Sequence, residues 1–425
     1  MHRFTLGRVR ATTLAVAAIV AAAATSQLAG QGAAQSSAAK DYIVVFHDDE
    51  PDAAGLAAAH GRAYGLTLHQ IYGSALKGYA ASIPGARLAD VQRDPRVAFV
   101  SEDRPVHASV QTIPTGVNRI DGELSSHFAS NTGWNLAVAV IDTGSGPHSE
   151  LTIAGGKNCS TGRSFNDGNG HGTHVAGTIG ALNNTAGVVG VAPGVPIYSV
   201  RVLDNTGNGS WSNVICGIDW VTANAAALNI KVANMSLEGA GADDANCGNT
   251  NNDALHKSIC SSVAAGVTYV VAAGNSGTNL SGTVPATYDE VLTVSAISDY
   301  NGQAGGGAAA TCRAGVDDSS ADFSNYATPG SVDEAHTIAA PGVCIQSTWK
   351  GGGYNTISGT SMASPHVAGV AALCINAGIC TGAPAAIINR LRSDASVQPI
   401  GYGFSGDPNS PSPDRYYGYL INARY

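Results

Sequence analysis

The most informative segment of this chain is Gly359-Thr-Ser-Met-Ala-Ser-Pro-His-Val-Ala-Gly369. A glycine turn leads directly into an apolar helical run, and Ser361 stands at the junction. A serine at this place projects its hydroxyl from a helix N-terminus, where the positive end of the helix dipole favours developing negative charge. We therefore predict that Ser361 is a nucleophile, and that Ser364 and His366, further along the same helix, are packing residues.

A second segment, Asn169-Gly-His-Gly-Thr-His-Val-Ala-Gly-Thr178, carries two histidines. Glycines flank His171, so other parts of the chain can approach it closely, and an apolar helix face begins just after it. A ring nitrogen at a helix start can serve as a general base. His171 is the candidate for this role, and His174, three residues later, could instead pack into the structure. Two histidines could instead bind a metal, but no H-E-x-x-H helix or nearby carboxylate pair supports a metal site here.

The third segment, Val140-Ile-Asp-Thr-Gly144, closes the continuous apolar run of residues 136–141. Such a run is typical of a parallel strand that is covered on both faces. Asp142 would then stand at the carboxyl edge of the sheet, where open α/β sheets place their sites. Because many strands end in Asp before a glycine turn, the prediction for Asp142 depends on the other two segments.

Apolar strand-like runs alternate with helical ones throughout the chain after about residue 112. The predicted strands are residues 136–141, 197–203, 231–235 and 267–272, and the predicted helices are residues 172–182, 213–228 and 253–265. This alternation predicts an α/β fold with a doubly wound, mostly parallel sheet and helices on both faces.

Together the three segments resemble the subtilase family of serine peptidases, nearest to its secreted proteinase K-like members. The resemblance runs from about residue 112 to Ala423 and includes the closing Tyr417-Gly-Tyr-Leu-Ile-Asn-Ala423. The chain order Asp, His, Ser differs from the order in α/β-hydrolases and in chymotrypsin-like enzymes. The resemblance implies a serine endopeptidase of broad substrate range that works through an acyl-enzyme. Its catalytic triad would be Asp142, His171 and Ser361.

The resemblance also implies an oxyanion hole. The segment Val271-Ala-Ala-Gly-Asn-Ser-Gly277 matches the family segment whose asparagine donates a side-chain hydrogen bond to the oxyanion, here Asn275. The backbone N–H of Ser361 would be the second donor. An asparagine before Ser-Gly is also common in ordinary turns, and the functional reading of Asn275 depends on the neighbouring motifs.

Two further segments resemble the walls of the family's substrate cleft. The strand in Asn234-Met-Ser-Leu-Glu-Gly239 would pair with the substrate backbone through Ser236, Leu237 and Glu238, and main-chain pairing tolerates many sequences. Ala272, Ala273 and Gly274 would form the opposite wall of the pocket for the residue that precedes the cut. Glu238 replaces the glycine usual in this strand. Its side chain either points to solvent or shifts the preference toward basic or small side chains.

Catalysis of this kind needs no cofactor, whereas the resemblance makes a structural calcium ion an open question. Relatives bind calcium at surface loops through carboxylates and backbone oxygens. In the proteinase K-like pattern an Asp usually precedes the Ile-x-x-Pro-Gly stretch, but Thr337 stands there, with Asp333 and Glu334 in a nearby insertion. No metal ligands are assigned.

The N-terminal part of the chain has a different composition. Residues 1–29 predict a cleaved secretory signal, because arginines precede an apolar run that is too short to span a bilayer. Residues 42–100 show a β-α-β-β-α-β pattern, which predicts a small α+β, ferredoxin-like domain. The resemblance implies that residues 30–111 are a linker and an inhibitory propeptide, and that residues 112–425 form the peptidase domain.

Charge and hydropathy limit the partners. The formal net charge of −9 argues against nucleic acid as the main partner. No stretch after the signal is long and apolar enough to cross a membrane. We expect a secreted, extracellular monomer that acts on proteins or peptides, with its own propeptide as an intramolecular inhibitor.

All eight cysteines lie in the predicted peptidase domain, and none forms a C-x-x-C pair. An even number after a secretory signal indicates disulfides rather than a zinc ribbon, although eight cysteines allow 105 pairings. Pairing of sequence neighbours predicts Cys247–Cys260, Cys312–Cys344 and Cys374–Cys380, which leaves Cys159–Cys216.

Three rival interpretations stay open at this point. An inactive relative that only binds peptides should have a damaged triad or lack Asn275, and neither is seen. A secreted lipase or esterase should show a G-x-S-x-G elbow and the order Ser, Asp, His. Residues 41–107 could also be an independent binding module rather than a propeptide.

Overall fold

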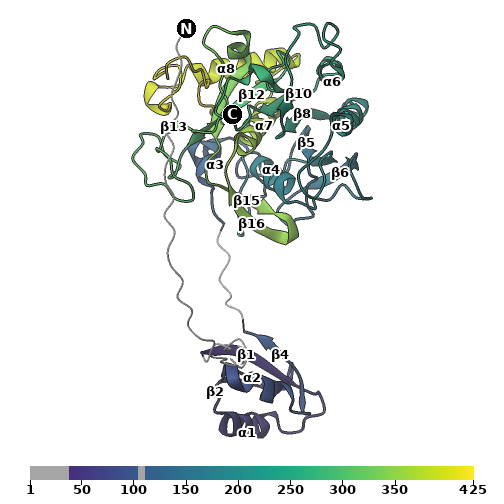
Figure 1. Ribbon diagram of the computed structural model, residues 1–425, viewed down its shortest axis with the longest axis vertical. Coiled ribbons are helices and arrows are strands. Elements are labelled where there is room, and N and C mark those ends of the chain that lie inside the picture. Colours follow the sequence, from purple (N-terminus) through teal and green to yellow (C-terminus); the bar gives the residue numbers. More distant parts are fainter. Residues whose placement is uncertain (1–37, 104–110) are drawn as a thin grey trace, which may run out of the picture. The chain divides into compact units, whose positions relative to one another are not determined.

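The computed structural model describes residues 38–103 and 111–425, which form two compact units (Figure 1). Among the described residues, no helix combines the length and the apolar character needed to cross a bilayer.

The N-terminal unit follows the predicted order β-α-β-β-α-β. Its elements are β1 Ala39–Phe46, α1 Ala53–Tyr64, β2 Thr67–Tyr72, β3 Gly78–Pro84, α2 Gly85–Gln92 and β4 Val97–Glu102. The strands pair in the order β2-β3-β1-β4, and every pairing is antiparallel. The Asp52 side chain caps the start of α1 by accepting from Gly55 N, and Gly65, at φ 67°, ends it. Val44, Phe46 and Ile83 are buried between sheet and helices.

The C-terminal unit is built around an eight-stranded sheet in the order β13-β12-β10-β8-β5-β7-β6, with β14 paired to β12. All neighbours are parallel except the short β13. The strands are β5 Ala137–Asp142, β6 Ile153–Asn158, β7 Ile197–Arg201, β8 Ile230–Met235, β10 Thr268–Ala272, β12 Leu292–Ser298, β13 Ser319–Ser320 and β14 Thr337–Pro341. From β5 the chain passes to the edge strand β6, returns to β7 between β6 and β5, and then crosses to β8 on the other side of β5. Strand order therefore reverses beside β5, which is the place where open α/β sheets bind ligands.

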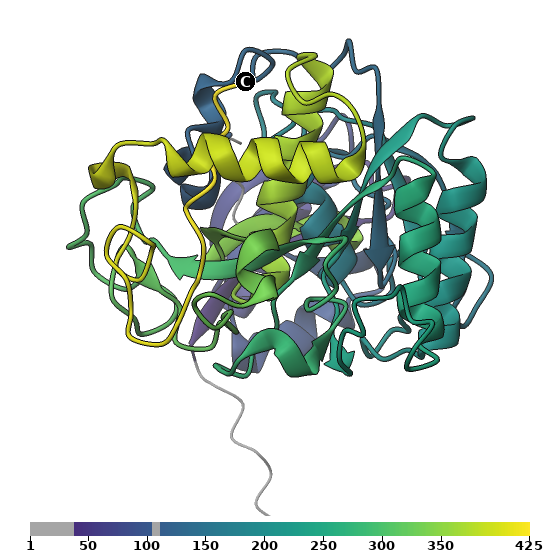
Figure 2. The same cartoon turned by 90° about the horizontal axis from the view of Figure 1, so that it is seen from above.

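Helices cover both faces of this sheet, as predicted. They are α3 Thr115–Arg119, α4 His171–Gly180, α5 Trp211–Asn224, α6 Ala254–Ala264, α7 Thr360–Asn376 and α8 Pro384–Ser396. Along β5, Val138 and Val140 face the core with α4 and α7, whereas Ala139 and Ile141 face the core with α5 and α6. Figure 2 shows α5 and α6 side by side at one edge of the unit. Because both faces are covered, β5 is apolar at every position before Asp142.

Shorter elements complete the unit. Two small antiparallel pairs join β9 Gly239–Ala240 to β11 Thr283–Val284, and β15 Ile345–Trp349 to β16 Gly353–Ile357. The short 3₁₀ helices are Gly122–Leu124, Leu280–Gly282, Val332–His336, Lys350–Gly352 and Ile400–Tyr402.

Several predicted boundaries were wrong by a few residues. The predicted strand 197–203 ends at Arg201, because the N–H groups of Val202 and Leu203 both bond to the Asp142 carbonyl oxygen instead of continuing the ladder. The predicted helix 213–228 begins at Trp211, where the Ser210 side chain caps it, and ends at Asn224. The sequence pattern did not predict β6, which pairs with β7, because two glycines and a lysine interrupt the apolar pattern of a strand.

All eight cysteines form disulfides, and the pairing is the predicted one. The bridges are Cys159–Cys216, Cys247–Cys260, Cys312–Cys344 and Cys374–Cys380. Three of them close loops of 6 to 32 residues, and the fourth spans 57 residues. Such cross-links stabilise a fold mainly by restricting the unfolded chain.

Candidate active site

The three predicted triad residues come from three elements that meet at the carboxyl edge of the sheet. Asp142 is the last residue of β5, His171 is the first residue of α4, and Ser361 lies in the first turn of α7. His171 and Ser361 line a cleft of about 790 Å³, whereas Asp142 lies fully buried behind the histidine.

The His171 ring is held by the Asp142 carboxylate. Its Nδ1 lies 2.8 Å from Asp142 Oδ1 and 3.0 Å from Oδ2, and Asp142 also accepts a bond from Thr143 N at 2.6 Å. Burial of the ring disfavours its charged form, but the Asp142 carboxylate, its hydrogen bond and the charge of Asp167 outweigh burial and raise the pKa of His171. The Nε2 end of the ring remains available toward the cleft.

The glycines beside His171 allow this approach. A Cβ on Gly172 would lie 2.0 Å from the carbonyl oxygen of Gly144 and 3.0 Å from Asp142 Oδ1, so the start of α4 could not reach β5. Gly170 has φ 119°, and a Cβ there would meet the Trp349 ring at 2.3 Å. The Gly-His-Gly pattern therefore reflects close packing around the catalytic candidate.

His174 is placed as the structural histidine that the sequence predicted. Its side chain is fully buried, and its Nε2 lies 2.9 Å from the carbonyl oxygen of Ile345. Burial lowers the pKa of His174 to about 3, so the ring is neutral. It lies in the packing between α4 and β15 and does not line the cleft.

Ser361 lines the same cleft, but its hydroxyl has another partner. Its Oγ donates to the carbonyl oxygen of Ser236 at 3.3 Å, and the described residues show no hydrogen bond between Ser361 and His171. Catalytic hydrogen bonds are often loose in structures without substrate. The Ser361 hydroxyl would have to leave the Ser236 carbonyl oxygen before it could bond to another group.

Asn275 is anchored by one end of its amide. Its Oδ1 accepts from Thr360 N at 2.8 Å and from Thr360 Oγ1 at 3.1 Å, directly before Ser361. Asn275 also lines the cleft, and within the described part of the chain its Nδ2 has no hydrogen-bond acceptor. The anchored oxygen fixes the orientation of the amide, so that Nδ2 is the end left to donate to a ligand.

A buried network that the sequence did not predict connects α7 to the strand after β8. Ser364 Oγ donates to Asn234 Oδ1 at 2.8 Å, and Asn234 Nδ2 donates to Ser236 Oγ at 3.0 Å. Ser236 Oγ in turn donates to the carbonyl oxygen of Ser361 at 2.8 Å. Ser364 is thus a packing residue, as predicted, and it also joins the nucleophile's helix to one wall of the cleft.

Five of the six predicted wall residues line the cleft: Ser236, Leu237, Glu238, Ala272 and Gly274. Ala273 does not line it. Its side chain is fully buried, because neighbouring residues of an extended segment point to opposite sides, and its N–H bonds to Val294. The cleft also includes a loop that the sequence did not predict, Thr206–Trp211, whose Gly-Asn-Gly-Ser composition was its only signal.

The region of Thr337 does not fit a calcium site. The Thr337 hydroxyl donates to the carbonyl oxygen of Asp333 at 2.7 Å, and Asp333 Oδ1 accepts from Thr287 at 2.9 Å. The carboxylates of Asp333 and Asp289 face the buried His336 ring at 3.8 and 3.9 Å. An imidazole, rather than a ring of oxygens, thus stands between these two carboxylates.

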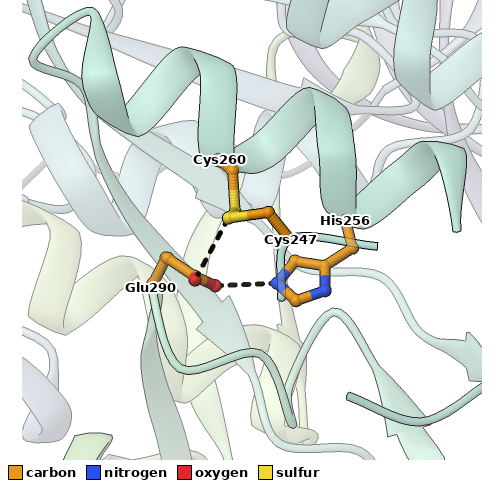
Figure 3. Close-up of side chains that lie close together, drawn as sticks. All are labelled: Cys247, His256, Cys260 and Glu290. Carbon is orange, nitrogen blue, oxygen red and sulfur yellow. Dashed lines mark hydrogen bonds and ion pairs between the residues drawn. A yellow bond between two sulfur atoms is a disulfide. The ribbon is translucent and has the colours of Figure 1, made fainter. Parts of the chain in front are cut away.

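A second group of ionisable side chains surrounds the start of α6, and none of its members lines the cleft. His256 is fully buried, and its Nε2 lies 2.8 Å from Glu290 Oε2 (Figure 3). Its ring also stacks on Tyr288. Glu290 Oε1 lies 3.6 Å from the sulfur of Cys247, which is bonded to Cys260. Because both sulfurs are used in a disulfide, neither is a thiolate that could hold a metal.

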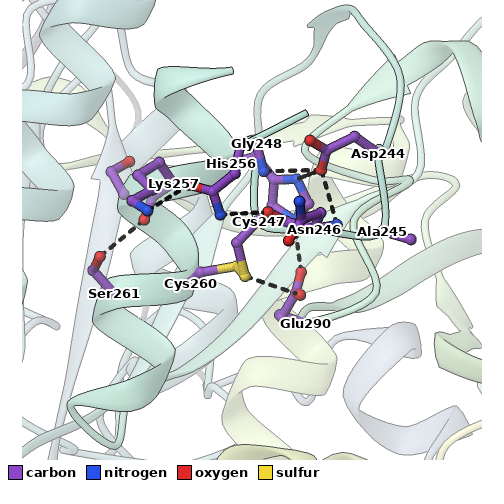
Figure 4. The surroundings of a disulfide bond; sticks show 12 residues. Asp244, Ala245, Asn246, Cys247, Gly248, His256, Lys257, Cys260, Ser261 and Glu290 are labelled. Carbon is purple, nitrogen blue, oxygen red and sulfur yellow. Dashed lines mark hydrogen bonds and ion pairs between the residues drawn. A yellow bond between two sulfur atoms is a disulfide. The ribbon is translucent and has the colours of Figure 1, made fainter. Parts of the chain in front are cut away.

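The other side of the His256 ring faces two aspartates. Its Nδ1 lies 3.3 Å from Asp243 Oδ1 and 3.3 Å from Asp244 Oδ1. Asp244 already accepts four backbone N–H bonds within its loop, from residues 246, 248, 250 and 251. Figure 4 shows Asp244 beside Asn246 and Gly248. Burial lowers the pKa of His256, but the hydrogen bond to Glu290 and the three carboxylate charges outweigh burial and raise it. The group is best described as a buried ion-pair cluster that fastens the loop before α6.

Comparison with known proteins agrees with this geometry. The sequence model of the Subtilase family (Peptidase_S8) matches residues 133–419. The chain is 36% identical over 363 residues to Subtilisin NAT of Bacillus subtilis subsp. natto, which covers 83% of this chain and 84% of that protein. It is 40% identical over 284 residues to Alkaline elastase YaB of Bacillus sp. (strain YaB), and this match covers 67% of this chain and 65% of that protein.

A solved structure is also similar. It is described as the crystal structure of a cold adapted subtilisin-like serine proteinase, with a TM-score of 0.56 and 32% identity over 74% of this chain and 99% of that chain. These relatives do not separate a proteinase K-like subgroup from other subtilisins. The family match covers more than half of the chain, and the chain belongs to the subtilase family of serine endopeptidases.

Proposed function

We propose that this serine endopeptidase cuts peptide bonds with Asp142, His171 and Ser361 as its triad. The observation that carries the proposal is the buried Asp142 carboxylate bound to His171 Nδ1, in a cleft that His171 shares with Ser361 and Asn275. A carboxylate that orients an imidazole beside a serine is the arrangement that activates a hydroxyl near neutral pH.

The mechanism follows from these positions. The Ser361 hydroxyl turns from the Ser236 carbonyl toward His171 Nε2, loses its proton to that nitrogen and attacks the substrate carbonyl carbon. His171 then gives the proton to the departing amine, and an acyl-enzyme remains. Water repeats the sequence and releases the acid. Asp142 keeps the imidazole in the tautomer with its proton on Nδ1 and stabilises the imidazolium.

Asn275 and the backbone N–H of Ser361 are proposed to bind the oxyanion. The Asn275 amide is oriented by Thr360, so its Nδ2 needs no reorganisation when the negative charge develops. Preorganised donors of this kind stabilise the transition state more than the ground state. The position of Ser361 at the N-terminus of α7 adds the favourable end of the helix dipole.

The substrate is proposed to lie in an extended form between two walls, Ser236–Glu238 and Ala272–Gly274. Main-chain pairing with the first wall would supply affinity that depends little on sequence, which explains a broad substrate range. No cofactor is needed for this chemistry.

We further propose that the chain is made as a secreted zymogen. Residues 1–29 would direct export and lie outside the described residues. Residues 30–111 would hold a propeptide that inhibits the enzyme until it is cut off, and residues 112–425 would form a monomeric extracellular peptidase. The compact N-terminal unit, which has its own core and no cysteine, supports a segment that can be separated from the rest.

The direct test is digestion of casein by the processed protein, with and without a sulfonyl or phosphonyl inhibitor directed at serine. We expect hydrolysis that stops when one inhibitor molecule is attached, and intact mass followed by peptide mapping should place that adduct on Ser361. The matched control is Ser393→Ala, which removes an exposed hydroxyl from α8 and should leave both results unchanged. Processed protein without hydrolysis, or an adduct at another residue, would refute the triad.

A further inference from the structure

Glu238 places a carboxylate in the substrate cleft. It follows β8 on the wall that is proposed to pair with the substrate, and its side chain is exposed. Among the described residues that line the cleft, it is the only Asp or Glu, and none is Lys or Arg. The cleft therefore carries one negative charge that no cation lining it balances.

The side chain does not extend straight into solvent but reaches the opposite wall. A Cβ added to Gly274 would lie 2.2 Å from Glu238 Oε2 and 2.3 Å from Asn325 Nδ2. The Glu238 carboxylate and the Asn325 amide thus both lie next to Gly274, in the slot between the wall of Ser236–Glu238 and the wall of Ala272–Gly274. Gly274, at φ 105°, leaves the room that the carboxylate fills.

Asn325 is a fixed neighbour. Its side chain is buried, and its Oδ1 accepts from the N–H groups of Ser276 and Thr278, each at 3.1 Å. Because the oxygen is used in this way, the NH₂ end must face Gly274 and Glu238. Asn325 Nδ2 donates to Thr283 Oγ1 at 3.3 Å and lies close to Gly274, beside the carboxylate.

Within the described residues, Glu238 itself has neither an ion-pair partner nor a hydrogen bond. An apolar substrate side chain in the slot would displace water from this carboxylate without offering a hydrogen bond in its place, and this desolvation costs free energy. A lysine or arginine side chain would instead give it a charge-assisted hydrogen bond.

We propose that Glu238 is a specificity residue that makes this peptidase prefer a lysine or arginine immediately before the cut. The inference rests on the proposed function of the cleft and narrows its substrate class. A charge-assisted hydrogen bond in a partly exposed slot corresponds to a preference of roughly tenfold or more in kcat/KM.

The test uses peptide substrates that are identical except for the residue before the cut. The decisive pair is arginine and citrulline, which have nearly the same shape but differ in charge, and lysine with norleucine forms a second pair. We expect arginine to be cut roughly tenfold faster than citrulline at low substrate concentration. Glu238→Gln, which keeps the shape and removes the charge, should bring the arginine-to-citrulline ratio close to one.

Asp219→Asn is the matched control, because it removes an equal exposed charge from α5 outside the lining of the cleft. The arginine-to-citrulline ratio of Asp219→Asn should equal that of the unchanged protein. Added salt should lower the ratio of the unchanged protein but not that of Glu238→Gln. If all substrates are cut and the ratio is near one in both proteins, the inference is wrong while the peptidase function stands. If no substrate is cut, the proposed function itself fails.

Discussion

Asp142 and His171 show how burial sets the chemistry of single residues. Asp142 is fully buried, but its oxygens accept hydrogen bonds from Thr143 N and from His171 Nδ1. These bonds offset the cost of removing the carboxylate from water. A buried charge that is paired in this way orients its partner. The pH dependence of the proposed site is expected to follow His171, whose pKa is raised.

Asp142→Asn should lower kcat by about 10⁴-fold while KM changes little, because an amide favours the wrong tautomer of His171. Steady-state kinetics of this variant would test the prediction.

In the unchanged protein, His171 must be neutral to act as the proposed base, and its pKa is raised above the ordinary value of 6.5. Activity should therefore fall as the pH drops through a midpoint above 6.5. A profile of kcat/KM against pH measures this midpoint, and an acid limb below 6.5 would contradict the assigned role of His171.

Asn275→Leu should lower kcat by about 10²- to 10³-fold and leave KM almost unchanged, because the lost donor acts only on the oxyanion. The Asn275 oxygen also holds Thr360, so the melting temperature should be measured together with the kinetics. A variant whose loss lies mainly in KM would show that Asn275 binds the substrate instead.

At the scale of elements, the site depends on how closely α4 approaches β5. The carbonyl oxygen of Gly144, the carboxylate of Asp142 and the backbone of Gly172 are packed with no room for a side chain. The position of His171 is thus set by the contact between a helix and a strand, and not by the histidine alone.

Gly172→Ala should destabilise the protein by roughly 1–3 kcal/mol, because the added methyl group overpacks this contact. It should also lower kcat, since His171 would move relative to Asp142. The control is Gly282→Ala, where a Cβ meets no atom within 4 Å. Denaturant unfolding and steady-state kinetics would test both variants, and equal behaviour of the two would refute the packing argument.

The loop before α6 offers a pH test at the same scale. The pKa of His256 is raised in the folded protein, so its ion pairs stabilise the fold fully below pH 6.5, and this contribution disappears as the pH rises through the folded pKa. His256→Gln should therefore cost more unfolding free energy at pH 6 than at pH 9. Denaturant titrations at several pH values would measure the difference, and a cost independent of pH would contradict the ion-pair description.

At the scale of the whole molecule, the chain consists of two units with separate hydrophobic cores. The eight cysteines and the cleft all lie in the larger unit. This division supports the proposal of a small segment that assists folding and is then removed from a secreted enzyme, in which disulfides would persist.

Ser361→Ala should accumulate as a precursor that retains residues 30–111, because self-cleavage needs the nucleophile. Intact mass of the secreted protein measures this directly, and Ser393→Ala should be processed normally. A Ser361→Ala protein that appears fully processed would show that another peptidase removes the segment, and a mature active protein that keeps it would favour an independent binding module.

Much of the fold and site could be predicted from local patterns. The apolar run of β5, the glycines around His171 and the turn before Ser361 are contiguous, so their meaning can be recognised without distant contacts. Boundaries failed where partners far away in sequence intervene: the Asp142 carbonyl ends β7, and the glycines of β6 pair only because β7 lies beside them.

The sequence alone was enough to propose Asp142, His171, Ser361 and Asn275 as site residues, because each stands in a short motif that can be recognised from neighbouring residues. The path of the Glu238 carboxylate to Gly274 and Asn325 could not be predicted in this way, and neither could the network from Ser364 through Asn234 to Ser236. Apart from the local bond between Asn234 and Ser236, these contacts join residues that are 36 to 130 positions apart in the chain. Only packing of the strands and of α7 brings them together, because side-chain direction across a cleft depends on how whole elements are placed.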